Sequence, residues 1–491
     1  MTTTVLPDAA AARAPTIAAP TPVRPRHLLA AVLTVSVVSG LAFGLPALSP
    51  LVRVTLGVFA LAVIAWTVLR WAETPVALAA ALALVAAGAV SVDRFQRALG
   101  HELVWMLAGA FLLAAAIRDS GLAERCIRRA LAGCRSMRGL VWRLTLLIAA
   151  TAFVVPSTSG RAALLLPVFL ALTQALGAPR LTRALALLFP SVIVLSAAAS
   201  PLGAGAHLAA LEFIAKLGLT PPSYGRWVLL AAPLALASCA VAAALVIHLF
   251  LSAEERAAAV TLPPADSAPS TRPQRWLALL TIATVAAWFT SPWHGASPAL
   301  VTVGAALLAT CRPLAGVSFK TALKGVEWNL ILFLAATLVM GDALLASGAA
   351  QALANAAAES IPASLRAQPA LLAAAVAALA MLSHLAITSR SARATVLIPA
   401  LALPLAVSAE QAMSLVLLVT LASGYCQTLR VSAKPVALLA TADRVDERDL
   451  IRLSLALMLP FLLLAVASAV LWWPALGVAL DAAQVVIDPR E

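Results

Sequence analysis

Two short polar stretches interrupt long apolar runs and carry side chains that could bind an ion within a membrane. They are residues 157–161, which read Ser-Thr-Ser-Gly-Arg, and residues 389–393, which read Ser-Arg-Ser-Ala-Arg. Hydroxyls, the free N–H groups where a helix begins and fixed guanidinium charge together favour a bound anion. The predicted substrate-binding residues are Ser157, Thr158, Ser159, Arg161, Ser389, Arg390, Ser391 and Arg393.

The arginines of these stretches admit a second interpretation. A charged side chain at the centre of a bilayer costs at least ~2.5–3.5 kcal/mol, so arginines retained there indicate a function. Alternatively, they reach the membrane surface or pair with a structural carboxylate. The candidate partners are Asp119, Asp342, Glu102 and Glu327.

Two further breaks, at residues 200–205 and 429–434, fall within apolar runs. Unwound backbone of this kind binds ions and substrate in transporters. A neutral histidine beside such a break could titrate near physiological pH, although a lone histidine is more often structural. Lys434 could instead mark the cytoplasmic end of its helix. The predicted ion-binding or coupling residues are Gly203, His207, Ser432 and Lys434.

These four stretches contain no Asp or Glu, which argues against a cation or proton antiporter. The sequence also has no phosphate-binding glycine loop, HExxH zinc motif or pair of catalytic carboxylates. Its five cysteines form no CxxC pair. We therefore expect no enzyme activity, no bound metal and no cofactor, apart from Na⁺ or H⁺ as a coupling ion.

The composition places these stretches in a membrane protein. Hydrophobic residues make up 62% of the 491 residues and charged residues 11%, whereas a soluble domain is typically ~45–50% apolar and ~25% charged. Apolar runs of ~17–25 residues have the length of membrane helices. We attribute the net charge of +13 to cytoplasmic loops rich in Lys and Arg rather than to nucleic-acid binding.

An internal repeat relates the two halves of the chain. The stretch from Ser157 to Pro167 matches that from Ser389 to Pro399 at a constant offset of 232 residues, with two Ser, Arg, Ala and Pro shared. When the basic segments are placed on the cytoplasmic side of the membrane, the two repeats cross it in opposite directions. The predicted fold is an all-α polytopic membrane protein with two inverted repeats, each with a re-entrant helical hairpin and a broken transmembrane helix.

About eleven spans plus two hairpins would fit this length. The predicted divisions are a disordered cytoplasmic tail (1–26), a first membrane half (27–251), a cytoplasmic linker (252–274), a second membrane half (275–475) and a C-terminal tail (476–491). We expect a bacterial inner-membrane protein whose N-terminus is cytoplasmic and whose C-terminus is periplasmic.

The sequence resembles the divalent anion/sodium symporter family, over about residues 75–475. The resemblance rests on Ser157-Thr158-Ser159 with Pro167, on Ser389-Arg390-Ser391 with Pro399, and on Pro201-Leu202-Gly203. It implies a homodimeric carrier of dicarboxylates, citrate or sulfate, with a fixed scaffold and a moving transport domain. It also implies that the hairpin serines contact the substrate and that sodium binds at the tips and breaks.

The chain departs from this family at charged positions. Thr158 and Arg390 replace family Asn residues, and Arg161 and Arg393 replace later Thr residues. A guanidinium repels Na⁺ and can take its electrostatic place. We therefore predict a secondary transporter of small divalent anions, with Arg161 and Arg393 neutralising the substrate. It would move as an elevator and act as an exchanger, a uniporter or a proton-coupled carrier. The alternatives are a cation/proton antiporter or arsenite-type permease, and a non-transporting membrane sensor.

Overall fold

The computed structural model describes residues 25–41, 47–260, 269–360, 368–441 and 443–480. Most of the two predicted tails and residues 261–268 of the predicted linker lie outside these ranges. Within them the chain is helical, and its one β-type contact is an isolated antiparallel bridge between Ser136 and Ala259. Eight helices of the described residues are long and apolar enough to cross a membrane, and several shorter apolar helices accompany them.

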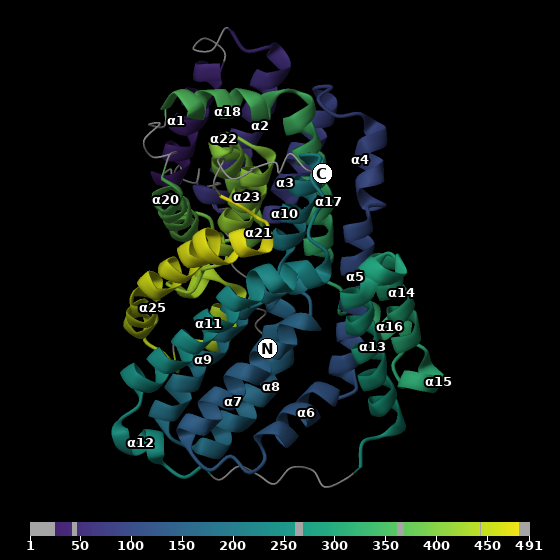
Figure 1. Ribbon diagram of the computed structural model, residues 1–491, viewed down its shortest axis with the longest axis vertical. Coiled ribbons are helices and arrows are strands. Elements are labelled where there is room, and N and C mark those ends of the chain that lie inside the picture. The colour runs from purple at the N-terminus through teal and green to yellow at the C-terminus, as the bar shows by residue number, and fades with distance from the viewer. Residues whose placement is uncertain (1–24, 42–46, 261–268, 361–367, 442, 481–491) are drawn as a thin grey trace, which may run out of the picture.

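Twelve helices form the first half of the chain, in purple to teal in Figure 1. They are α1 (Pro25–Ser39), α2 (Pro50–Thr67), α3 (Glu73–Ala86), α4 (Val92–Leu99), α5 (Glu102–Asp119), α6 (Leu122–Leu131), α7 (Met137–Ala150), α8 (Thr158–Leu176), α9 (Pro179–Ser196), α10 (Gly205–Lys216), α11 (Tyr224–Phe250) and α12 (Ala253–Ala257).

The second half continues in green and yellow. Its helices are α13 (Arg272–His294), α14 (Pro298–Ala309), α15 (Arg312–Ala315), α16 (Phe319–Leu323), α17 (Trp328–Ala346), α18 (Ala349–Ser360), α20 (Pro369–Leu382), α21 (Arg390–Leu397), α22 (Leu403–Leu405), α23 (Ala409–Ser423), α24 (Lys434–Leu439) and α25 (Glu447–Ala467).

Local sequence signals fix many helix ends. Ser136, Ser223 and Thr271 each accept a backbone N–H of the first turn and cap α7, α11 and α13. Gly177 ends α8 in the left-handed conformation, with φ of 62°. Helix α6 is amphipathic, because its Ile127 and Leu131 are buried while its Arg128 and Arg129 are exposed.

The repeat is confirmed element by element. The first hairpin is α7, a 3₁₀ turn (Thr151–Phe153) and α8; the second is α20, a 3₁₀ turn (Ser383–Leu385) and α21. A π-helical segment, Ile398–Ala402, continues α21 into α22. In Figure 1 the hairpins come from opposite ends of the molecule and their tips meet near the middle, as inverted repeats require.

The helix breaks repeat in their backbone angles. After α9 the chain forms two 3₁₀ turns, the second at Pro201–Gly203, and then begins α10; after α23 it forms the turn Arg430–Ser432 and then begins α24. Ala204 has φ of −156° and ψ of 148°, and Ala433 has φ of −153° and ψ of 145°. The two broken helices therefore have the same local geometry.

The helices pack in two groups. We call α2, α3, α5, α13, α14 and α17 the scaffold helices, because α3 packs on α17 and α5 packs on α14 and α17. We call α7–α11 and α20–α25 the hairpin bundle, which is held by contacts of α9 with α11 and of α20 with α23. The groups meet where α10 packs on α17, and there Lys216 Nζ lies 3.0 Å from Asp342 Oδ1.

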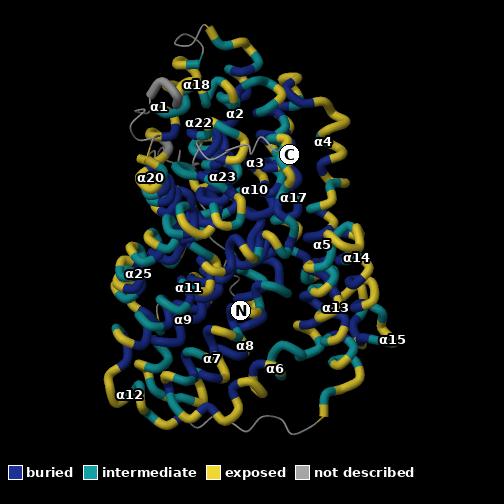
Figure 2. Tube along the Cα trace, viewed as in Figure 1, coloured by how far each residue is buried: buried dark blue, intermediate teal, exposed yellow. Residues whose placement is uncertain are grey.

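Burial separates central helices from peripheral ones (Figure 2). In the most apolar 18 residues of the span Pro179–Ala199, which contains α9, 78% of the residues are buried. In α13 the corresponding share is 22%, and apolar side chains such as Leu279 and Ile282 are exposed. In a membrane these exposed residues would face lipid. One continuous core cluster joins the hairpin bundle to the scaffold helices, and α9 and α17 are its most buried spans.

Candidate functional site

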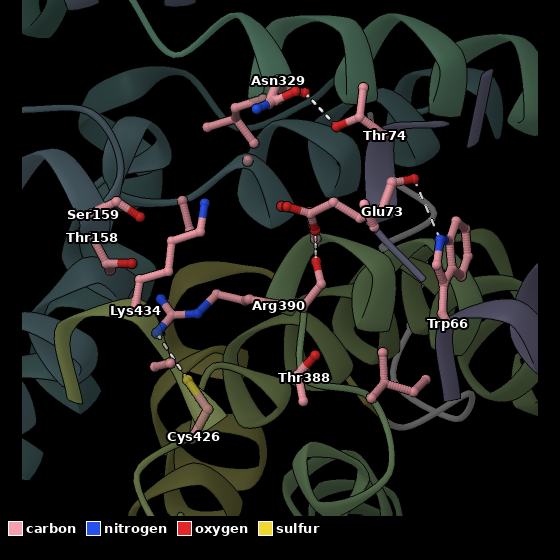
Figure 3. Close-up of a pocket in the computed structure, with 18 of the residues that line it drawn as sticks. Trp66, Glu73, Thr74, Thr158, Ser159, Asn329, Thr388, Arg390, Cys426 and Lys434 are labelled. Carbon is pink, nitrogen blue, oxygen red and sulfur yellow. Dashed lines mark hydrogen bonds between the residues drawn. The ribbon is translucent and has the colours of Figure 1, made fainter. Parts of the chain in front are cut away.

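Both hairpin tips and both helix breaks line one cavity of about 510 Å³ (Figure 3). The first tip contributes Ser157, Thr158 and Ser159, and the second contributes Thr388, Ser389, Arg390 and Ser391. The breaks contribute Ala204 and Gly205 on one side, and Val431, Ser432, Ala433 and Lys434 on the other. Sequence positions more than 200 residues apart are thus brought to a single site.

Six helices begin at this cavity. The first residues of α8, α10, α21, α24 and α3 line it, as do Glu327 and Asn329 around the start of α17. A helix N-terminus carries about half a positive charge and unpaired N–H groups. The backbone therefore makes the cavity electropositive before any side chain is counted.

Three cationic side chains add to that potential. Arg70, Arg390 and Lys434 line the cavity. The Nη2 of Arg390 donates to the carbonyl of Val194 at 3.2 Å and to Cys426 Sγ at 3.4 Å, so its guanidinium is held in place. Lys434 is the first residue of α24, not the end of a helix, and its side chain is exposed to the cavity.

Arg161 does not line the cavity. It is fully buried, and its guanidinium donates to Thr151 Oγ1 at 2.9 Å, to the carbonyls of Ile193 and Ile148 at 2.8 and 2.7 Å, and to Ser196 Oγ at 2.6 Å. These bonds fasten α8 to α7 and α9. Its predicted role as a substrate ligand does not fit this geometry, because every guanidinium nitrogen already donates to protein.

Arg393 likewise lies behind the cavity wall. It is fully buried, and its Nη1 donates to the carbonyl of Ile387 at 2.8 Å, which closes the tip of the second hairpin. The two arginines were predicted from the same motif position to neutralise the substrate. In the structure Arg390, three residues earlier, points to the cavity instead.

Two carboxylates from outside the hairpin tips and breaks enter the cavity, and one of them, Glu327, was predicted only as a candidate partner of the arginines. Ser157 Oγ donates to Glu327 Oε1 at 2.6 Å, and Ser389 Oγ donates to Glu73 Oε2. Glu73 is the first residue of α3 and Glu327 is the N-cap of α17, so both come from the scaffold helices. The premise that the site lacks carboxylates is therefore wrong, because it considered only the hairpin tips and the breaks.

The four predicted coupling residues divide into two pairs. Ser432 and Lys434 line the cavity, and Gly203 and His207 do not. A Cβ on Gly203 would lie 2.0 Å from the carbonyl oxygen of Ala197, so this glycine allows the backbone of the break to fold closely on itself. His207 is 1% exposed; its Nδ1 bonds the carbonyl of Ser200 at 2.9 Å and its ring lies 5.2 Å from that of Trp227.

The geometry defines a class of protein. An all-helical membrane protein with two inverted hairpins and two broken helices around one charged cavity is a secondary transporter. Residues 59–424 match the family described as CitMHS, citrate transporter, and the chain belongs to that family.

The solved structures contain a similar fold. The crystal structure of the Alcanivorax borkumensis YdaH transporter, described as having an unusual topology, aligns with a TM-score of 0.53 and 18% identity over 79% of this chain and 88% of that one. No curated protein matches the sequence.

Proposed function

We propose that the protein carries a small di- or tricarboxylate anion, which binds in the cavity between the hairpin tips. One observation carries the proposal: three cationic side chains and six helix N-termini converge on the single cavity that both tips share. The description of its family as citrate transporters supports the same substrate class. The cavity volume of about 510 Å³ suits a molecule of that size.

Two of the three cations in the cavity have distinct roles in this proposal. The planar guanidinium of Arg390 can bind one carboxylate through two parallel N–H···O bonds, and Lys434 supplies a compact charge for another. The hydroxyls of Thr158, Ser159 and Ser391 can orient the anion from both tips. Arg161 and Arg393 support the hairpins from behind and do not touch the substrate.

We further propose that the hairpin bundle moves against the scaffold helices as an elevator. The bundle contains both tips and both breaks, so it carries most of the cavity wall with it. The scaffold contributes Arg70, Glu73 and Glu327 from one side. Because Arg390 occupies a position expected to be Asn in a sodium-dependent carrier, transport is proposed to be independent of Na⁺.

The carboxylates favour one competing function. Glu73 and Glu327 are the kind of groups that a cation/proton antiporter uses to exchange its ions. Three cations in the same cavity would repel a bound metal ion, and this favours the anion. Sodium efflux driven by a pH gradient in proteoliposomes would establish the antiporter instead.

Pairs of residues at the ends of the helices support the proposed orientation. Arg180 lies 3.8 Å from Glu255, and Arg183 lies 3.3 Å from Asp449, so basic segments from both halves gather at one end of the molecule. We propose that this end is cytoplasmic, in the inner membrane of a bacterium. That would leave the C-terminus on the periplasmic side. A homodimer remains part of the proposal and can be measured by mass in detergent.

The decisive experiment is uptake of labelled citrate, succinate and sulfate into proteoliposomes, with and without a Na⁺ gradient. Arg390→Gln should raise the KM for the transported anion at least ~10-fold, since a lost charge-assisted bond is worth ~1.5–3 kcal/mol. Arg226→Gln is the matched control, because Arg226 is exposed and donates to the carbonyl of Leu476 away from the cavity. Normal transport by Arg390→Gln, or no anion transport by the unaltered protein, would refute the proposal.

A further inference from the structure

An apolar groove adjoins the polar cavity on its scaffold side. It has a volume of about 620 Å³ and runs between α2 and α3, and every residue that lines it is apolar or aromatic. Small and branched side chains form most of its walls, among them Val58, Leu61 and Ala62 of α2 and Val76, Ala79 and Ala83 of α3. The groove therefore has the size and lining to hold an alkyl chain.

The groove and the cavity meet at one turn of the chain. Trp71, Ala72 and Pro75, where α2 gives way to α3, line both spaces. The side chain of Trp71 is 59% exposed there. A molecule that lay across this turn would have one end among the cations of the cavity and the other among the apolar side chains of the groove.

Arg70 lies at the same turn and lines the cavity. Its φ of 54° is in the left-handed region, which is uncommon for a residue other than glycine. The N–H of Trp71 donates to the carbonyl of Ala65 at 2.9 Å, which folds the chain back on the end of α2 and holds this conformation. Within the described part of the chain the guanidinium of Arg70 has no hydrogen-bond or ion-pair partner. An unpaired cation thus stands where the groove joins the cavity.

We infer that the site also binds dicarboxylates that carry an apolar substituent, with the carboxylates in the cavity and the substituent in the groove. Arg70 binds the carboxylate nearest the turn, while Arg390 and Lys434 bind the other. The charge of the cavity and the apolar lining of the groove thus match the two parts of one molecule. The inference rests on the proposed anion binding and names a second class of ligand for the same site.

Such a ligand should inhibit transport and not be carried itself. The groove lies between two scaffold helices, α2 and α3, whereas Arg390 and Lys434 belong to the hairpin bundle. A molecule bound to both would tie the bundle to the scaffold until it dissociated. Succinate and citrate have no chain to place in the groove, so the bundle can move with either of them bound.

The test measures uptake of labelled succinate or citrate into proteoliposomes in the presence of methyl-, propyl- or pentylsuccinate. Each CH₂ buried in the groove should strengthen binding about 4-fold, so the concentration for half inhibition should fall at least ~10-fold from methyl- to pentylsuccinate. Ala79→Phe fills the groove from an exposed position on α3 and should remove this gain. The KM for the transported anion should stay within about 2-fold.

Three further variants separate the groove from other causes. Ala283→Phe is the matched control, because Ala283 is an exposed alanine of α13 that does not line the groove, and it should keep the full effect of chain length. Ala83→Leu places a smaller group in the groove and serves if the Phe variant folds poorly. Arg70→Gln should weaken binding of methyl- and pentylsuccinate equally, since it removes charge and leaves the groove intact.

Calorimetry on the protein in nanodiscs tests the groove without any transport. Burial of apolar surface makes the heat-capacity change of binding more negative. This change should be more negative for pentylsuccinate than for methylsuccinate with the unaltered protein, and equal for the two ligands with Ala79→Phe. The result does not depend on which anion the protein carries.

Each outcome decides a different point. Inhibition that does not depend on chain length, or a dependence that survives both Ala79→Phe and Ala83→Leu, would overturn the groove as a binding site. Uptake of labelled pentylsuccinate as fast as that of succinate would overturn its role as an inhibitor. A change in particle mass on filling the groove would assign it to a second copy of the chain. Absence of uptake of any anion would refute the proposed function, and calorimetry would still decide the groove.

Discussion

The guanidinium of Arg161 donates to the hydroxyl of Ser196 at 2.6 Å and thereby joins the first hairpin to α9. With its three other bonds, this side chain acts as a buried brace rather than as a ligand.

Replacing Arg161 should lower the stability of the folded protein. Arg161→Gln would remove the guanidinium donors to two buried carbonyls and two hydroxyls, and each lost bond is worth ~0.5–1.5 kcal/mol or more. We expect a lower melting temperature in detergent and less folded protein in the membrane. The KM of whatever protein folds should change little, which separates Arg161 from Arg390. A large rise in KM with unchanged melting would contradict this assignment.

The backbone conformation of Ser157 predicts that the two hairpin tips respond differently to substitution of their N-cap serines by Gly or Ala. Ser157 has φ of 66° and ψ of 143°, which is sparsely populated for any residue but glycine and costs ~1–3 kcal/mol, whereas Ser389 has an ordinary φ of −78°. Both are N-caps, and loss of a capping hydroxyl costs ~0.5–2 kcal/mol. Thermal melting should therefore show Ser157→Gly more stable than Ser157→Ala, with no such advantage of Gly over Ala at position 389.

The two glycines of the first break should tolerate alanine differently. A Cβ on Gly203 meets the backbone carbonyl of Ala197 at 2.0 Å, and backbone cannot yield cheaply. A Cβ on Gly205 meets Leu330 Cδ1 at 2.7 Å, which is the end of a flexible side chain. Gly203→Ala should abolish folded protein in size-exclusion chromatography, while Gly205→Ala should fold and transport with reduced affinity. If Gly203→Ala folded and Gly205→Ala did not, the backbone of the first break would relax more than its packing suggests.

His207 should not set the pH dependence of transport. Its ring is enclosed by Trp227 and bonded to the carbonyl of Ser200, outside the cavity. His207→Gln should lower thermal stability and leave the shape of the rate-against-pH curve unchanged. A rate-against-pH curve that shifts by half a pH unit or more in this variant would show that His207 is a coupling residue.

Sequence patterns were sufficient for the hairpins and breaks because their signals are local. The Ser-x-Ser tips, the following apolar arms and the Pro-Leu-Gly break each occupy a few consecutive residues, and the repeat doubles the evidence. The short helices α4 and α18 were not predicted. The first is largely exposed and polar, and the second is Ala-rich, so neither resembles a membrane span.

The roles of individual charged residues were harder to predict. Arg390, Arg393 and Arg161 lie within a turn of a hairpin tip, and sequence spacing alone does not tell which side of the helix faces the cavity. Two residues three apart in an α-helix, such as Arg390 and Arg393, point in directions only about 60° apart. Which of the two side chains reaches the cavity therefore depends on how deeply each one is buried. Glu73 was not predicted, and Glu327 was named only as a candidate partner of the arginines, because nothing local marks either residue as part of the cavity.

One shared feature marks the two glutamates: each stands at the start of an apolar helix that precedes the hairpin of its half. This feature is not sufficient by itself, because Glu102 also begins an apolar helix, α5, and accepts from Ser297 instead.

The crossed carboxylate–serine bonds make each half of the chain depend on the other. The first half gives Glu73 to the tip of the second, and the second gives Glu327 to the tip of the first. Neither half therefore completes the cavity alone. Genes for residues 1–264 and 265–491, expressed together, should therefore restore transport that neither fragment supports alone.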